Sequence, residues 1–322
     1  MDAGPGGMNP ALAVCLGRAP AAVPAVETVA QWLPQWRAVA AAHAAPFDRA
    51  LAGGCCADRV GWAFASGYQA ALRALVPGLI GDEAIAALCV TEEAGNRPRD
   101  ITTTITRLAE GDIAIDGAKR WTTLGPGSTL LLVAGRIAGP GDRPQLRVAR
   151  VPSGTPGLAL TAMPPTRFVP EVPHARVTLA SVRLGADALL PGDGYDGYVK
   201  PFRTLEDTLV TAAVLAYLLR EARARGWPAG FRERIVAALQ ALADVAQGAA
   251  GAPANHVLLA GALRWALALY AEADALWAAS GDEAAQRWQR DAALFAVAAS
   301  AREARAVRAW ERLAAAGGEC HA

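Results

Sequence analysis

The spacing of apolar residues changes twice along this chain of 322 residues, and that change constrains the fold more than any other feature. Residues 26–88 place apolar side chains at three- and four-residue steps, as amphipathic helices do. Residues 89–190 carry short alternating runs rich in Thr, Val and Ile that end at Gly, Pro or Asp, as strands joined by turns do. From residue 198 onward the helical spacing returns. The pattern predicts an α+β chain in three parts.

The strand-rich part predicts a small barrel or sandwich. Its alternating segments are residues 100–109, 112–121, 129–137, 145–152 and 175–184. The last part predicts an up-and-down bundle of four long helices joined by short breaks. These helices are expected over residues 204–223, 231–247, 254–279 and 282–316. We therefore expect an N-terminal helical domain over residues 1–88, a middle β-barrel over 89–197 and a helical bundle over 198–322.

The composition of the chain argues against several classes of protein. The chain is 53% hydrophobic and 19% charged, which is enough apolar material for a large core. Its formal net charge of +1 argues against nucleic acid as a partner. Residues 1–17 lack a basic segment and a long apolar core, so we interpret them as a frayed terminus rather than a signal peptide. No apolar run is long enough to predict a membrane span.

Cysteine and histidine usage favours neither disulfides nor a metal. The odd number and irregular spacing of the cysteines give no disulfide framework, which favours a reducing cytoplasm. They are Cys15, Cys55, Cys56, Cys89 and Cys320. The histidines lie far apart and show no ligand spacing, so no metal site is expected. They are His43, His174, His256 and His321.

Two motifs in the middle part carry a family resemblance. The run CVTEEAG (residues 89–95) is followed about thirty residues later by DGAKRWTT (residues 116–123). Together with the order of the elements, they resemble the Thr-Glu loop and the Trp-x-Thr strand of the acyl-CoA dehydrogenase family. Residues 155–160, 175–184 and 191–198 are similar to its later strands and its glycine-rich hinge. The resemblance implies an N-terminal α domain, a middle β-barrel and a C-terminal four-helix bundle.

The resemblance also implies a flavin, FAD, held in a cleft between barrel and bundle by Thr91, Trp121 and Thr123. An indole is a flat apolar wall for the ring system, and a Thr hydroxyl can satisfy its polar edge. The alternative is that Trp121 is a core aromatic beside a turn.

Arg97 stands about where the family has a phosphate-contacting Ser. A guanidinium there could bind a pyrophosphate or CoA phosphate, plug the site, or pair with Asp100. Gly317 and Gly318 resemble the family's Gly-Gly turn, which contacts the partner subunit's FAD. An ordinary helix C-cap is the alternative.

Catalysis in the family needs a carboxylate that removes the α-proton of a thioester. The usual Glu follows the Gly-Gly turn, and this sequence stops at Ala322. Glu206 occupies the place of an alternative family base, although Asp207 replaces an Arg that follows it there. The alternative is that both acids favour the positive end of a helix dipole. We interpret Glu92 and Glu93 as shaping their loop, and His174 as a loop or core-edge residue.

The resemblance thus implies an FAD-dependent oxidoreductase that dehydrogenates an acyl-CoA, as in fatty acid metabolism. A homodimer or homotetramer built through the bundle, and an electron-transfer partner, are expected with it. Two alternatives stay open: a catalytically inactive scaffold or partner subunit, and a CoA-ligand binding protein without flavin.

Overall fold

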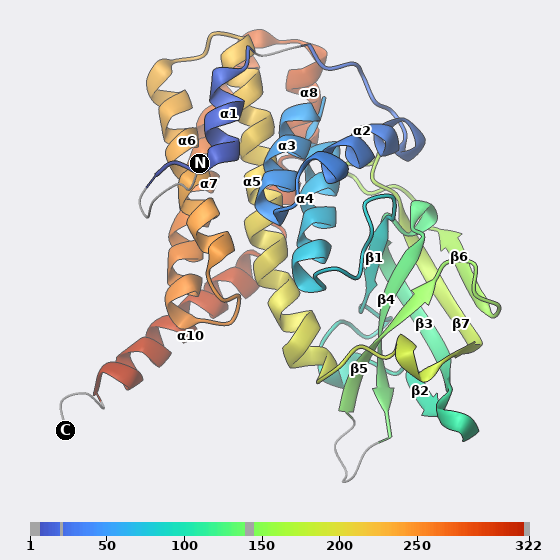
Figure 1. The fold of residues 1–322 in the computed structure, drawn as a ribbon. Coiled ribbons are helices and arrows are strands. Elements are labelled where there is room, and N and C mark those ends of the chain that lie inside the picture. Colours follow the sequence, from blue (N-terminus) through green and yellow to red (C-terminus); the bar gives the residue numbers. More distant parts are fainter. Residues whose placement is uncertain (1–6, 20–21, 139–144, 319–322) are drawn as a thin grey trace.

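A computed structural model describes residues 7–19, 22–138 and 145–318. Helices from both ends of the sequence gather on one side of the molecule and a sheet forms the other side (Figure 1). The helices before the sheet are α1 (Pro10–Gly17), α2 (Val29–Ala42), α3 (Pro46–Cys56) and α4 (Val60–Leu75). Those after it are α5 (Lys200–Ala224), α6 (Ala229–Gln247), α7 (Pro253–Ser280), α8 (Glu283–Asp291), α9 (Ala293–Ala296) and α10 (Ala299–Gly318).

Within the described residues the sheet has seven strands, and three of them pair with β4. The strands are β1 (Ala86–Cys89), β2 (Thr104–Arg107), β3 (Ile113–Thr123), β4 (Leu130–Ile137), β5 (Gln145–Pro152), β6 (Leu158–Ala162) and β7 (His174–Leu184). Strand β4 pairs antiparallel with β5, and parallel with both β1 and β2. Strand β2 continues antiparallel to β3, then β7, then β6. The apolar side chains inside the sheet form a separate core, in which Ile113, Ile115 and Val133 are fully buried.

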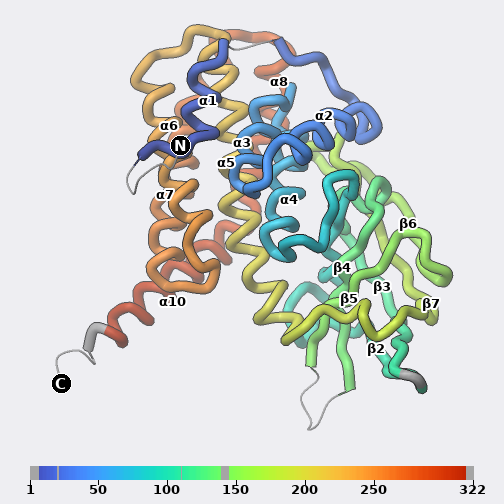
Figure 2. Tube along the Cα trace, viewed as in Figure 1, coloured from blue at the N-terminus to red at the C-terminus, as the bar shows by residue number. Residues whose placement is uncertain are grey.

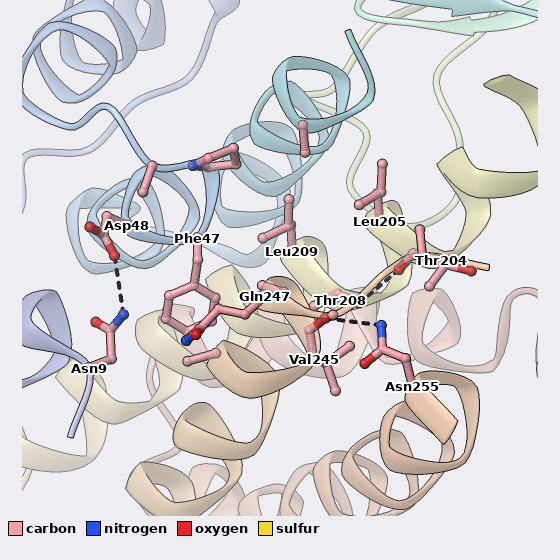
Figure 3. A pocket seen from close by; sticks show the side chains of 17 residues that line it. Asn9, Phe47, Asp48, Thr204, Leu205, Thr208, Leu209, Val245, Gln247 and Asn255 are labelled. Carbon is pink, nitrogen blue, oxygen red and sulfur yellow. Dashed lines mark hydrogen bonds between the residues drawn. The ribbon is translucent and has the colours of Figure 1, made fainter. Parts of the chain in front are cut away.

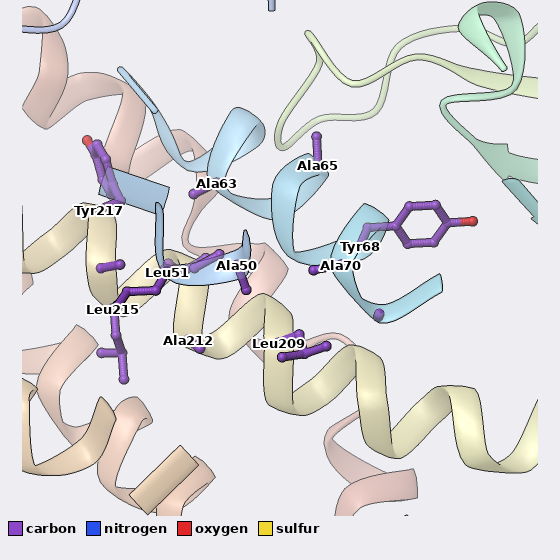
Figure 4. Packing of buried hydrophobic residues seen from close by; sticks show 14 of the residues in the cluster. Ala50, Leu51, Ala63, Ala65, Tyr68, Ala70, Leu209, Ala212, Leu215 and Tyr217 are labelled. Carbon is purple, nitrogen blue, oxygen red and sulfur yellow. The ribbon is translucent and has the colours of Figure 1, made fainter. Parts of the chain in front are cut away.

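Helix α5 joins the two helical parts into one core. Figure 4 shows Leu51 of α3 next to Leu215 of α5, and Ala63 of α4 belongs to the same buried cluster. Two glycines permit this contact, because a Cβ at Gly54 would lie 2.0 Å from the Ala213 carbonyl oxygen and one at Gly67 would lie 2.5 Å from a Cα of α5. Since both helical parts bury residues in this one cluster, the boundaries of three separate domains stay a prediction.

Two expectations for the N-terminal part are wrong. Residues 10–17 are not frayed: they form α1, whose N-cap Asn9 accepts a hydrogen bond from Leu12 N, and Leu12 is fully buried. Residues 86–88 belong to β1 rather than to the helical region, because Ala86 pairs with Leu130 in the sheet.

The fourth bundle helix is also not continuous over 282–316. It is divided into α8, α9 and α10, and Ala298 between the last two has a φ of 66°. The Asp291 carboxylate accepts hydrogen bonds from Val169 N at 2.7 Å and from the Arg290 side chain. This tertiary contact fixes the end of α8 against the segment before β7. None of the helices within the described residues is long and apolar enough to span a membrane.

Candidate functional site

The segment that follows β1 is tied to β3. The carbonyl oxygen of Thr91 accepts a hydrogen bond of 2.9 Å from Arg120 N. Glu92 and Gly95 close a small turn through their backbones. Thr91 therefore lies next to the strand that carries Trp121 and Thr123.

Glu92 anchors this segment. Its carboxylate receives hydrogen bonds from the backbone and hydroxyl groups of Thr102 and Thr103, and from Lys119 Nζ at 2.6 Å. Both Glu92 and Lys119 are buried. Burial alone would raise the pKa of Glu92, but these donors lower it to about 2. A carboxylate with every lone pair engaged holds the loop and is not free to accept a proton, in agreement with the loop-shaping interpretation.

Trp121 is exposed rather than part of the core. Its side chain is 44% accessible, so the alternative of a core aromatic is wrong. The β3–β7 register shifts between Lys119 and Thr122, and Trp121 has a φ of 57°, in the left-handed region that non-glycine residues rarely adopt. The irregularity turns the indole outward while Thr122 stays buried against Cys89. A bulge that re-aims one side chain is a recurring feature of binding sites.

His174 supports the indole from β7. The two rings are in edge-to-face contact with centroids 6.0 Å apart. His174 also pairs across the strands with Thr123, and Met163 Sδ accepts a hydrogen bond from Trp121 N. Burial lowers the pKa of His174, so its ring is neutral near pH 7. The sequence motif did not contain this residue, and only strand pairing reveals it.

Arg97 lies in the same segment as Thr91 and is exposed. Its backbone N donates to Asp100 Oδ2, while the ion pair of Asp100 at 3.7 Å is with Arg99. The expected alternative of an Arg97–Asp100 ion pair is therefore not formed. The neighbouring Asn96 accepts a 3.4 Å hydrogen bond from Arg203, which places the start of α5 against this segment.

Glu206 and Asp207 lie further along α5 and differ in their partners. Asp207 is buried and pairs with Arg302 at 2.8 Å and Arg305 at 2.7 Å, both from α10. Glu206 is partly buried, and its carboxylate accepts no hydrogen bond from residues 7–19, 22–138 and 145–318. Burial, and then the charge of Asp207, raise the pKa of Glu206 to about 8, against the opposing effect of Arg302.

The helix-dipole alternative for this acidic pair is wrong. Helix α5 begins at Lys200, and its first turn holds no acidic residue. Glu206 instead contributes to the electrostatic environment of Tyr68 on α4. The Tyr68 hydroxyl accepts a 2.9 Å hydrogen bond from Leu88 N in β1, the strand that leads to Thr91. Burial raises the pKa of Tyr68, Glu206 lies near enough to raise it further, and Tyr68 in turn contacts β1.

A cavity of about 270 Å³ lies on another face of α5, between α3 and α6 (Figure 3). Thr204, Leu205 and Thr208 line it, whereas Glu206 does not. None of Thr91, Trp121 and Thr123 lines it either, so it is not the expected cleft between barrel and bundle.

Gly317 and Gly318 are the last two residues of α10 and are helical rather than a turn. In Figures 1 and 2 this end of α10 points away from the sheet. Within the described part of the chain, no group of three or more His, Cys, Asp or Glu could hold a metal ion.

No family model and no curated protein matches the sequence. Solved structures do match the fold. Butyryl-CoA dehydrogenase from Megasphaera elsdenii is 18% identical with a TM-score of 0.66, over 82% of this chain and 81% of that one. FkbI, for biosynthesis of a methoxymalonyl extender unit, is 21% identical with a TM-score of 0.64 over 84% of both chains. FMN-bound TdsC from Paenibacillus sp. A11-2 is 17% identical with a TM-score of 0.64, over 84% of this chain and 82% of that one. The chain therefore has the acyl-CoA dehydrogenase fold, as its middle motifs predict.

Proposed function

We propose that this protein is a flavin-dependent oxidoreductase that dehydrogenates an acyl-CoA thioester. The observation that carries the proposal is the outward-facing Trp121, held at a strand irregularity beside Thr91 and Thr123. An exposed indole fixed by its backbone and by His174 offers a rigid apolar surface to a planar ring. The residues present thus fit a flavin, and FAD is the form that the family resemblance favours.

Each residue of the site has a proposed role. Trp121 provides the wall for the ring system, and the hydroxyls of Thr91 and Thr123 satisfy its polar edge. Arg97, whose guanidinium is exposed, binds a phosphate of the cofactor or of CoA. Gly317 and Gly318, the last residues of α10, contact the cofactor of a partner subunit. A bound flavin would supply the acceptor for the hydride that leaves the β-carbon.

Glu206 is the proposed general base that takes the α-proton. Its carboxylate has no hydrogen-bond donor within the described residues, so its lone pairs are free. The pKa of about 8 places its ionisation near neutral pH, where a base is most effective. Asp207 does not compete for this role, because two arginines of α10 hold it.

The proposal includes a homodimer or homotetramer and an electron-transfer partner, in a reducing cytoplasm. Helices α7 and α10 expose several large apolar side chains, of which Leu267 lines a groove of about 450 Å³ between the two helices. These include Leu258, Trp265, Leu267, Val307 and Trp310. Association through this face would bury them.

The test begins with cofactor binding. The purified protein is titrated with FAD and, separately, with FMN, and quenching of flavin fluorescence is followed. We expect binding below about 10 µM, and a loss of at least fivefold in Trp121→Ala, the scale of about 1–3 kcal/mol for aromatic stacking. Trp121→Phe keeps a flat aromatic face at the same position and is the matched control, which should retain most of the affinity. Folded protein that binds neither flavin would overturn the flavin assignment and leave the CoA-binding alternative.

The second step mixes the flavin-loaded protein anaerobically with acyl-CoA thioesters of increasing chain length. Loss of the flavin absorption band with at least one thioester is the expected result. A loaded protein that no thioester bleaches would favour the inactive scaffold or partner subunit.

A further inference from the structure

Two cysteines that are 40 residues apart meet between α1 and α3. The Sγ atoms of Cys15 and Cys55 are 3.0 Å apart. A disulfide bond is about 2.05 Å long, so closure requires a movement of only about 1 Å. Both thiols are free in this structure.

The backbones on both sides of this contact are fixed. Arg223 of α5 donates to the carbonyl oxygens of Cys15 at 2.9 Å and Leu16 at 3.0 Å. Cys55 follows Gly54, where α3 lies so close to α5 that a Cβ would meet the Ala213 carbonyl oxygen. The two sulfurs are therefore held together by packing and hydrogen bonds that do not involve the thiols themselves.

The surroundings distinguish the two thiols. The hydrogen bond from Cys55, and then the charges of Arg223 and Arg18, lower the pKa of Cys15 to about 7 although burial opposes them. The same hydrogen bond and burial raise the pKa of Cys55 well above its usual value. Burial also raises the pKa of Cys56, and the charge of Arg220 only partly offsets the rise in the pKa of Cys55 and of Cys56. Of the three neighbouring thiols, Cys15 is the one that ionises near neutral pH.

We propose that Cys15 and Cys55 form a reversible dithiol–disulfide site that hydroperoxides oxidise. The Cys15 thiolate attacks the terminal oxygen of the hydroperoxide, breaking the O–O bond, forming a sulfenic acid and releasing an alcohol or water. The Cys55 thiol then loses its proton and attacks the Cys15 sulfur, forming the S–S bond and releasing water. The two thiols lose two electrons and two protons in total, and a reducing dithiol reverses the change.

The disulfide would fasten α1 to α3, and the N-terminal ends of both helices border the cavity of about 270 Å³. Asn9, the N-cap of α1, and Asp48 of α3 both line that cavity and lie 3.5 Å apart at their polar atoms. Oxidation would therefore add a covalent link to the contacts that already hold α1 against this wall. This site does not depend on flavin or on Glu206.

The full-length protein is treated with hydrogen peroxide, blocked with an alkylating agent and mapped by non-reducing peptide mass spectrometry. We expect one crosslink, between the Cys15 and Cys55 peptides, which dithiothreitol reverses. Because the link closes a loop of about 40 residues, the melting temperature should rise by about 5 °C on oxidation. Cys56→Ser is the matched control and should retain both effects, whereas Cys15→Ser and Cys55→Ser should lose both.

Several outcomes would overturn the assignment. One is a folded wild-type protein whose Cys15 and Cys55 remain fully alkylated after peroxide treatment. Another is a crosslink that uses Cys56 or Cys320 in place of Cys55. A melting temperature that rises equally in Cys15→Ser would show that the stabilisation has another source.

Discussion

The segment after β1 and the second turn of α5 each contain a pair of adjacent acids, and the two pairs differ in the pKa of their first member. Glu92 is buried and receives hydrogen bonds from Thr102, Thr103 and Lys119, which lower its pKa to about 2. Glu206 is partly buried and receives none within the described residues, and its pKa rises to about 8. A carboxyl group that loses contact with water thus has a lowered pKa where protein donors replace the water, and a raised pKa where none do.

The second member of each pair differs as well. Glu93 is exposed and bonds with Arg120 and Arg176 at the surface of the sheet. Asp207 is buried and holds α10 through two arginines. One carboxylate in each region is therefore structural, at Glu92 and at Asp207. Only Glu206 combines low solvation with free lone pairs, which is what a proton acceptor requires.

The largest expected effect comes from Glu206→Gln. If Glu206 is the base, the anaerobic rate of flavin bleaching by an acyl-CoA should fall about 10²–10⁴-fold. Stopped-flow absorbance measures it, with flavin affinity determined in parallel. Glu83→Gln, at an exposed carboxylate outside the site, is the control and should leave the rate unchanged. An unchanged rate in Glu206→Gln would exclude Glu206 as the base.

Substitution of Glu92, in the segment after β1, should change the stability of the protein. Glu92→Gln leaves the buried Lys119 ammonium without its carboxylate, which typically costs about 3–5 kcal/mol of unfolding free energy. Urea unfolding followed by circular dichroism measures the change. Glu93→Gln, next in sequence but exposed, should change stability by less than about 1 kcal/mol. Equal stability of the two variants would mean that the Glu92 network does not hold the loop.

The pH dependence should separate the two carboxylates. With a pKa of about 8, the ionised fraction of Glu206 grows about tenfold between pH 7 and pH 9, and the bleaching rate should follow it. In the folded protein Glu206 stays protonated up to about pH 8, whereas in the unfolded chain its carboxyl group ionises near pH 4.3. The free energy of unfolding should therefore fall as pH rises from about 4 to 8. Glu206→Gln removes this slope.

The contribution of Glu92 to stability changes with pH in the opposite direction. Its folded pKa of about 2 lies below the unfolded value, so its contribution is complete above about pH 5 and is lost as pH falls toward 2. Urea unfolding at pH 3 and pH 6 in wild type and Glu92→Gln measures this. The two proteins should differ less at pH 3, and a difference independent of pH would contradict the network.

The sequence predicts the parts of the fold that depend on neighbouring residues, and it does not predict those that depend on contacts between residues far apart in the chain. Periodicity located β5 at residues 145–152 and the long helices α5, α6 and α7, because apolar spacing is a local property. It missed α1, a helix of eight residues among Gly and Pro, and it joined α8 to α10. The break depends on Asp291 and Val169, which are 122 positions apart.

The same limit applies to the site. The motifs identified Trp121, but its exposure results from a register shift against β7 that no local pattern contains. The acidic pairs Glu92–Glu93 and Glu206–Asp207 look alike in the sequence. They are distinguished by Lys119 in one case and by Arg302 and Arg305 of α10 in the other, and these contacts exist only after folding.

The smallest expected effect concerns Arg97, in the segment that Glu92 anchors. Its guanidinium is exposed and its backbone alone bonds to Asp100, so the side chain is free to reach a phosphate. A contact at the surface competes with water and salt, so Arg97→Ser should weaken FAD or CoA-ester affinity by only about fivefold, about 1 kcal/mol. Isothermal titration at low and high salt measures this, with Arg99→Ser as the neighbouring control. Since Coulombic contacts at exposed sites are screened, the difference between Arg97→Ser and wild type should shrink at high salt. Equal affinities at low salt for both ligands would place Arg97 outside the site, and the anchored loop would then serve the flavin through Thr91 alone.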